Sequence, residues 1–270
     1  MIPNPRLVVC DLDGTLVDSD KRLRPAEIAA VRRLDAAGIG FAVISARPRS
    51  GVMPIVEALG LDGEQAAFNG GTIFRRDGAV VRRETVDEAV VRGMFALTRG
   101  VAVEPWVFAG DRWHAAAGRG LHADRERKSS NQEPIVTADF APLYGDVDKL
   151  TFVSDDEPLL RGLREQALAR FGARATIVQS QTYYLDVTPL AGNKGDGIRA
   201  LAASRGVDLA DTVAIGDQAN DLAMLDRAGF GIVMGNAPDK VKACAGAVTL
   251  SNDEDGVAYA IDTLILGRRA

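Results

Sequence analysis

The chain has 270 residues, of which 47% are hydrophobic and 26% charged, a balance that is typical of folded domains and not of a disordered chain. Its net charge of -5 argues against a general nucleic-acid-binding protein, although local basic groups can still hold a small anion. No apolar run approaches the roughly 20 residues that cross a bilayer, and charged Asp11 comes too early for the apolar region of a secretory signal. We therefore expect a cytoplasmic protein that binds neither nucleic acid nor membranes.

The first predicted strand ends at two carboxylates. The apolar run 8–10 is followed by Asp11, by Asp13 one residue further on, and by Gly14, which permits a sharp turn. In an open α/β sheet the binding crevice lies at the carboxyl ends of the strands, so these acids are placed to face a ligand. Two other interpretations of this run are an ordinary turn and a calcium-binding loop. A calcium loop would follow a helix and carry a Glu at its twelfth position, whereas a strand precedes this run and that Glu is lacking.

Helices and strands alternate after this point. Pro25 starts a predicted helix that Gly38 ends, and the buried strand 41–44 stops at Ser45. A second helix then covers 48–60. This β-α-β-α order predicts a parallel sheet with Ser45 at the same edge as Asp11, although a serine there is commonly only a turn or cap residue.

The middle of the chain has a different pattern. A third strand at 66–69 leads into a hairpin at 72–81 that turns at Asp77-Gly78. The stretch 118–134 is polar and charged with little apolar periodicity, so we interpret it as a solvated loop. The remaining predicted elements form an α+β layer, with helices at 86–97 and 158–171 and strands at 101–108, 112–116, 150–153, 175–179 and 183–187.

The last third of the chain returns to the first pattern. Asn193 can cap a helix that has Lys194 in its first turn, where a cation opposes the helix dipole. This position indicates an anion nearby, although a solvated surface lysine is the simpler interpretation. The strand 212–215 ends at Asp217, and Asp221 lies near the start of the next helix. Asp221 could be present only because an acidic side chain is favourable at the start of a helix. Asp217 lies in the turn between the strand and the helix, where this explanation does not apply.

Four of these stretches resemble the motifs of one superfamily. The run Asp11-Leu12-Asp13-Gly14-Thr15 resembles motif I of the haloacid dehalogenase superfamily. Ser45 is similar to motif II, Lys194 in Gly192-Asn193-Lys194-Gly195 to motif III, and the run from Gly216 to Asp221 to motif IV. The run Asn69-Gly70-Gly71 and the large insert resemble the Cof-type branch with a type IIB cap.

The resemblance implies a fold. It is a Rossmann-like, doubly wound parallel-sheet core formed by residues 1–82 and 188–270, with an inserted α+β cap domain at 83–187. One departure concerns motif II, where that branch usually has Thr-Gly-Arg and this chain has Ser45-Ala46-Arg47. The hydroxyl is kept, but the backbone freedom of glycine is lost.

The resemblance also implies roles for the site residues. Asp11 would be the nucleophile that forms an aspartyl-phosphate, and Asp13 would protonate the leaving alcohol and then activate water. Magnesium would be held by Asp11, the Asp13 backbone carbonyl and Asp217, and by waters that Asp221 binds. The phosphoryl group would be bound by Ser45 and Lys194, with Ala46, Asn193 and Asn220 as further substrate-binding candidates.

These roles predict a magnesium-dependent phosphatase that hydrolyses small phosphomonoesters, with sugar phosphates favoured. Its partner would be a small phosphorylated metabolite. A phosphomutase would use the same carboxylates but return the phosphoryl group to the product. A non-catalytic protein that binds phosphometabolites is a third possibility, which Asp11 and Asp13 disfavour because binding alone needs neither a nucleophile nor a proton shuttle. The oligomeric state is left open.

Overall fold

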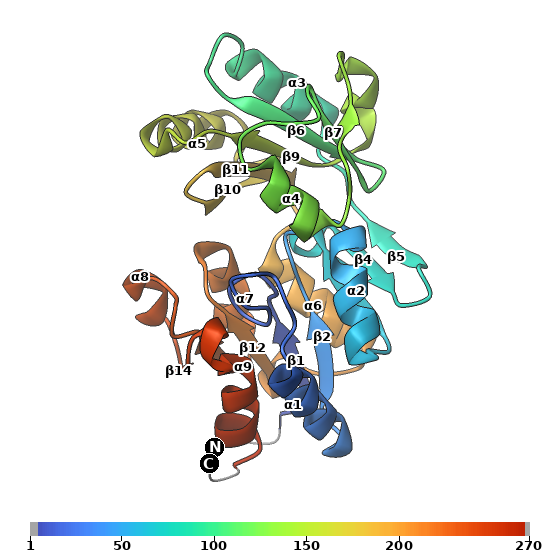
Figure 1. The fold of residues 1–270 in the computed structure, drawn as a ribbon, viewed down its shortest axis with the longest axis vertical. Coiled ribbons are helices and arrows are strands. Elements are labelled where there is room, and N and C mark those ends of the chain that lie inside the picture. The colour runs from blue at the N-terminus through green and yellow to red at the C-terminus, as the bar shows by residue number, and fades with distance from the viewer. Residues whose placement is uncertain (1–4, 268–270) are drawn as a thin grey trace.

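The structure, a computed structural model, describes residues 5–267. A five-stranded sheet forms the lower part of the molecule in Figure 1, with strand order β14-β13-β12-β1-β2. Every neighbouring pair in it is parallel. Its strands are β1 (Leu7–Cys10), β2 (Gly40–Val43), β12 (Thr212–Gly216), β13 (Phe230–Val233) and β14 (Ala247–Val248). Because β1 and β12 are neighbours in the middle of the sheet, the residues that follow them meet at one edge.

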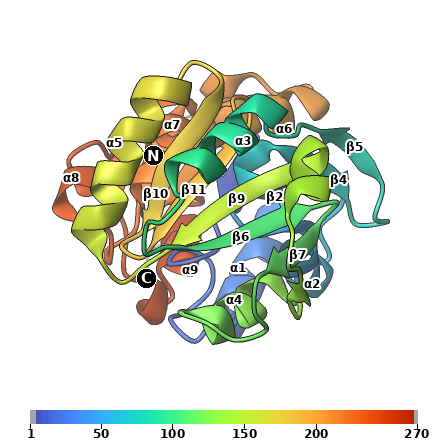
Figure 2. The same cartoon turned by 90° about the horizontal axis from the view of Figure 1, so that it is seen from above.

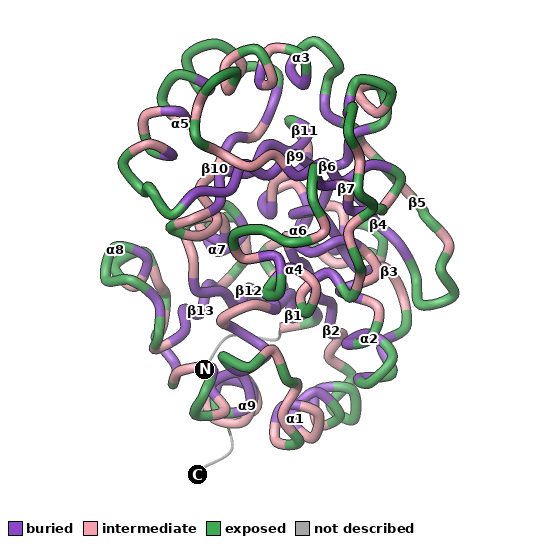
Figure 3. The backbone as a smooth tube through the Cα atoms, turned by 45° about the horizontal axis from the view of Figure 1, so that its top comes forward, coloured by how far each residue is buried: buried purple, intermediate pink, exposed green. Residues whose placement is uncertain are grey.

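Helices cover both faces of this sheet. Alternate side chains of β1 point to opposite faces, so that Cys10 packs among the residues of one apolar cluster and Val9 among those of another. The first face is covered by α1 (Pro25–Ala36), α2 (Arg49–Leu59) and α9 (Gly256–Tyr259), which continues as a π-helix (Ala260–Ile265). The second face is covered by α6 (Lys194–Ser204), α7 (Leu222–Arg227) and α8 (Asp239–Lys242). Figure 3 shows the strands buried between helices whose outer sides are exposed. The predicted doubly wound core is confirmed.

A small antiparallel sheet extends the core. It consists of β3 (Glu64–Ala67), β4 (Thr72–Arg75) and β5 (Val80–Arg83), and a parallel bridge between Ile44 and Ala66 places β3 beside β2. The predicted strand at 66–69 ends at Ala67 because Asn69 adopts a left-handed conformation, with φ of 57°, in a 3₁₀ turn. A Cβ atom on Gly70 would lie 2.8 Å from the Gly197 Cα, so this turn lies directly against α6.

The insert forms a second layer. Its six-stranded sheet has the order β10-β11-β9-β6-β7-β8 and is antiparallel except for the β7–β8 pair. The helices α3 (Glu88–Leu97) and α5 (Glu157–Phe171) lie over its outer face, as the view from above shows (Figure 2). The strands are β6 (Glu104–Ala109), β7 (Arg112–Ala115), β8 (Ile135–Val136), β9 (Val147–Val153), β10 (Ala175–Gln181) and β11 (Tyr184–Pro189).

The prediction that 118–134 is a solvated loop is wrong. This stretch contains the helix α4 (Ala123–Ser130), whose inward side carries Ala123, Glu126 and Ser130. Because none of these is a large apolar residue, the sequence has no hydrophobic periodicity there. The helix is instead held by contacts with α2: the Ser50 hydroxyl donates to the Ser130 carbonyl oxygen at 2.6 Å, and a side chain on Gly51 would collide with the Ser129 backbone.

No helix within residues 5–267 is long and apolar enough to cross a bilayer.

Candidate active site

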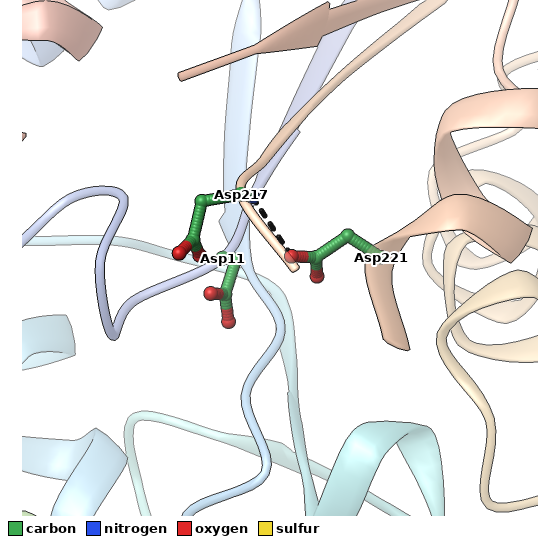
Figure 4. Close-up of side chains that lie close together, drawn as sticks. All are labelled: Asp11, Asp217 and Asp221. Atoms are coloured by element: carbon green, nitrogen blue, oxygen red, sulfur yellow. Dashed lines mark hydrogen bonds between the residues drawn. The ribbon is translucent and has the colours of Figure 1, made fainter. Parts of the chain in front are cut away.

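Three carboxylates converge at the carboxyl edge of the parallel sheet. Asp11 follows β1, Asp217 follows β12, and Asp221 ends the short turn before α7 (Figure 4). One oxygen from each lies within 4.8 Å of the others, and all three residues are buried. The Asp11 backbone N–H donates to the Ile215 carbonyl oxygen at 2.9 Å, which fixes the two strand ends side by side.

The surroundings hold each carboxylate in place. One Asp221 oxygen accepts from the backbone N–H groups of Asp217 at 2.9 Å and Gln218 at 2.8 Å. The Thr15 hydroxyl donates to Asp217 at 3.1 Å. Burial, together with the charge of Asp221, raises the pKa of Asp217 to about 7. Burial also raises the pKa of Asp11, while the charge of Lys194 opposes this shift.

Lys194 lies between two of the carboxylates. Its side chain is buried, with Nζ 2.5 Å from an Asp11 oxygen and in contact with the second oxygen of Asp221. Although burial lowers the pKa of Lys194, the charges of Asp11 and Asp221 raise it above its usual value. The alternative of a solvated surface lysine is therefore wrong. Asn193 caps α6 as predicted, because its side-chain oxygen accepts from the Asp196 N–H at 2.9 Å.

The set of three carboxylates and one ammonium group has a deficit of positive charge. Hard carboxylate oxygens are the ligands that divalent cations such as Mg²⁺ prefer, and a cation would offset the charge that makes burial unfavourable. Burial and the charge of Asp221 raise the pKa of Asp217, and a cation beside this carboxylate would oppose both effects. The residues present therefore fit a divalent metal ion.

Asp13 has a different environment from Asp11. Arg47 forms a bidentate pair with it, with Nε at 2.7 Å and Nη2 at 2.8 Å from the two carboxylate oxygens, and Lys21 Nζ lies at 2.5 Å. Burial alone would raise the pKa of Asp13, but the charges and hydrogen bonds of Arg47 and Lys21 lower it well below its ordinary value. In this arrangement Asp13 is an anion.

The motif II residues lie beside these groups. Ser45 is buried and its hydroxyl oxygen accepts from the Arg47 backbone N–H at 3.2 Å. Ala46 adopts a negative φ, so the alanine causes no backbone strain where a glycine is usual. Both residues line the pocket that contains Asp11, as does Asn220. Asn193 does not line this pocket, and its predicted contact with substrate stays a prediction.

Sequence reasoning missed the other side of the pocket. The insert contributes residues from α4, from β9 and from the β10–β11 hairpin: Arg125, Glu126, Ser129, Lys149, Ser180, Gln181, Tyr183, Tyr184 and Asp186. These positions are scattered over the chain and share no motif. The only local signal was the spacing of small and polar residues at 123, 126 and 130, which fits one side of a helix.

Both histidines lie in the insert. His122 stacks on Tyr183 with ring centroids 3.8 Å apart, and its Nε2 lies 2.7 Å from Asp155. His114 Nδ1 lies 3.0 Å from the Thr137 hydroxyl. Cys10 is buried and Cys244 exposed, and both are free thiols.

Comparisons with known proteins show the family to which the chain belongs. The haloacid dehalogenase-like hydrolase family matches residues 8–261. The phosphatase YwpJ of Bacillus subtilis is 28% identical over 96% of this chain and 100% of its own length. A solved haloacid dehalogenase-like hydrolase from B. subtilis has a TM-score of 0.85 at 27% identity, and covers 96% of this chain and 100% of its own. A haloacid dehalogenase subclass IIB sugar phosphatase shares the fold, with a TM-score of 0.84 at 22% identity over 96% of this chain and 98% of its own. The chain is an enzyme of the haloacid dehalogenase-like hydrolase family.

Proposed function

We propose that this enzyme is a magnesium-dependent phosphatase that hydrolyses small phosphomonoesters, with sugar phosphates favoured, through an aspartyl-phosphate on Asp11. The observation that carries the proposal is the meeting of Asp11, Asp217, Asp221 and Lys194 at one sheet edge. Phosphoryl transfer needs a nucleophile, neutralisation of the phosphoryl oxygens and a proton for the leaving oxygen. The chain supplies residues for each of these needs.

Asp11 is the proposed nucleophile. Its carboxylate attacks phosphorus, the bond from phosphorus to the ester oxygen breaks, and the leaving oxygen takes a proton from Asp13. In the second step a water molecule passes its proton to Asp13 and attacks the phosphorus, which releases phosphate and the Asp11 carboxylate. Lys194 neutralises charge on the phosphoryl oxygens, and the Ser45 hydroxyl donates to one of them. Ala46, Asn193 and Asn220 are the further substrate-binding candidates.

Asp13 must gain and lose a proton in this scheme. With Arg47 and Lys21 both bound to it, Asp13 is held as an anion, which suits a base and opposes an acid. Substrate that enters the pocket would compete for these two cations, because both residues line it. We infer that substrate binding weakens the Arg47 and Lys21 contacts and so readies Asp13 for proton transfer.

A divalent cation, in our proposal Mg²⁺, would be held by the carboxylates of Asp11, Asp217 and Asp221 and the backbone carbonyl of Asp13. When bound, it neutralises negative charge on the nucleophile and on the phosphoryl group. Thr15 and the backbone N–H groups of Asp217 and Gln218 orient the carboxylates for this role.

Residues 83–187 are proposed to act as a cap over a core formed by 1–82 and 188–270. Support comes from the pocket, whose lining passes from the strand ends of the core to α4, β9 and β11 of the insert. A cap in this position excludes water and contacts the leaving group.

The test is the release of free phosphate from a panel of small phosphate esters. Purified protein is treated with a chelator and dialysed, and phosphate is then measured with and without added Mg²⁺. We expect turnover only with the metal, together with the free alcohol as the product. Full activity after rigorous chelation would contradict the metal site, and a product that retains phosphate would indicate a phosphomutase.

A further inference from the structure

The insert side of the pocket holds charged groups that do not pair with one another. Lys149 on β9, Asp186 on β11 and Glu126 on α4 are each less than a tenth exposed and line the pocket. Among residues 5–267 none of the three forms an ion pair. Buried charges without a counterion are unfavourable unless some other group satisfies them.

The partners that these groups do have leave bonding capacity free. Lys149 Nζ donates to the Ala46 carbonyl oxygen at 3.2 Å and lies 4.5 Å from the centre of the Phe108 ring. One Glu126 oxygen accepts from the Ser129 hydroxyl at 3.2 Å. An ammonium group has three donors and a carboxylate has about four acceptor positions, so most of their capacity is unused.

Tyr184 gives a second, independent observation. It lines the same pocket, is less than a tenth exposed, and its hydroxyl is buried without a hydrogen-bond partner in the described part of the chain. A buried hydroxyl with no partner is uncommon in a folded protein, because the lost hydrogen bond is not replaced. Together with the free capacity of Glu126 and Lys149, this indicates that a ligand completes the set.

The position of α4 is fixed by the core. The Ser50 hydroxyl on α2 bonds the Ser130 carbonyl oxygen, and the Gln132 amide donates to the Ser50 hydroxyl at 2.6 Å. Gly51 allows the two helices to approach at Ser129, three residues after Glu126. A carboxylate on a helix held in this way is placed over the same pocket that Asp11 lines.

We propose that Glu126, Lys149, Asp186 and Tyr184 form a hydroxyl-binding subsite that selects neutral, polyhydroxylated leaving groups. This inference rests on the proposed phosphatase function and adds the residues that recognise the alcohol. A hydroxyl group donates to a carboxylate and accepts from an ammonium group, so adjacent hydroxyls match this mixed set. A second phosphate on the substrate would lie against two carboxylates and is disfavoured.

The test compares three esters with the Mg²⁺-loaded enzyme: sorbitol 6-phosphate, n-hexyl phosphate and the corresponding hexitol 1,6-bisphosphate. We expect the highest kcat/KM for sorbitol 6-phosphate. Glu126→Gln should lower that value by about tenfold or more, the effect of losing a charged hydrogen bond, and leave n-hexyl phosphate nearly unchanged. The ratio between the two esters is the readout, because a general structural defect would lower both. Glu165→Gln, at an exposed position of α5, is the matched control.

The outcomes separate this inference from the proposed function. Hydrolysis of all three esters with equal kcat/KM, or a preference for the bisphosphate, would contradict the proposed subsite. Either result would still agree with the proposed phosphatase function. Parallel loss on both monoesters in folded Glu126→Gln would also overturn it. No hydrolysis of any ester would overturn both. If Glu126→Gln does not fold, Asp186→Asn is measured in its place. The comparison of the three esters with the unaltered enzyme also tests the subsite without any variant.

Discussion

The pocket lies between the carboxyl edge of the parallel sheet and the insert, and these two sides are built in different ways. On the sheet side, Lys194 contacts both Asp11 and Asp221, and Asp13 is paired with Arg47. On the insert side, Glu126 and Lys149 line the same pocket without forming an ion pair within residues 5–267.

We propose that this difference separates chemistry from recognition. Groups that react must be held in a fixed geometry before the substrate arrives, and in the proposed mechanism the contacts around Asp11 would do this. Groups that select a leaving group must offer free donors and acceptors, which is the role that we propose for Glu126 and Lys149. A substitution on the sheet side should therefore lower the reactivity of every ester, whereas one on the insert side should change preference among them.

Lys194→Met should give the largest loss on the sheet side. Methionine is close in length but has no charge, so kcat/KM should fall by about 10²- to 10³-fold for all esters, the usual effect of removing one transition-state donor. Because Lys194 is buried between Asp11 and Asp221, the metal-free protein should also lose roughly 3 to 5 kcal/mol of stability. Steady-state kinetics and urea unfolding measure the two effects, with exposed Lys240→Met as the control. Unchanged kinetics would remove Lys194 from the site.

The pKa of Asp217 predicts a pH dependence. Its pKa is raised to about 7 in the folded protein, so the folded state binds a proton more tightly than the unfolded state between about pH 4 and pH 7. The metal-free protein should therefore lose stability as the pH rises through this range, by about 1.4 kcal/mol for each unit of pKa difference. Asp217→Asn should flatten that part of the profile.

The same proton competes with a metal ion. The affinity for Mg²⁺, measured as the increase in Tm on adding it, should fall as the pH drops below 7. Superimposable pH profiles for the unaltered protein and Asp217→Asn, measured by urea unfolding with a chelator present, would contradict the assignment.

Ala46→Gly should have the smallest effect. Because Ala46 has a negative φ, the glycine relieves no strain, and kcat/KM should change by less than about twofold, which corresponds to less than ~0.5 kcal/mol. Stability should fall by about 0.4 to 1 kcal/mol, since glycine gives the unfolded chain more freedom. A large gain in kcat/KM would mean that the alanine distorts the phosphoryl site.

Much of the sheet side could be predicted from the sequence. Asp11, Ser45 and Asp217 each follow an apolar run, and parallel strands bring such positions to one edge. The position of Lys194 in a first helical turn already indicated a nearby anion, and the structure places two carboxylates there.

The rest depended on contacts between distant parts of the chain. Asp13 and Arg47 are joined only in three dimensions, and their pairing reverses the pKa shift that burial alone would give. The helix α4 has no large apolar residue and is fixed by Ser50 and Gly51, about 80 residues earlier in the chain. Neither feature leaves a periodic pattern, so local sequence reasoning does not detect it.

In the proposed mechanism, Asp11 accepts the phosphoryl group. Asp13→Asn separates the two steps, because nitrophenolate leaves without a proton while hydrolysis of the aspartyl-phosphate still needs a base. Rapid quenching of folded Asp13→Asn enzyme with p-nitrophenyl phosphate and Mg²⁺ should show a burst of nitrophenolate near one equivalent per site, with a phosphorylated protein and slow turnover after it. Asp11→Asn should give no burst and no phosphorylated protein. A burst that persists in Asp11→Asn would contradict this mechanism. Asp13→Asn would contradict it too if the variant hydrolysed alkyl and nitrophenyl esters with the same loss of rate and no phosphorylated protein were trapped.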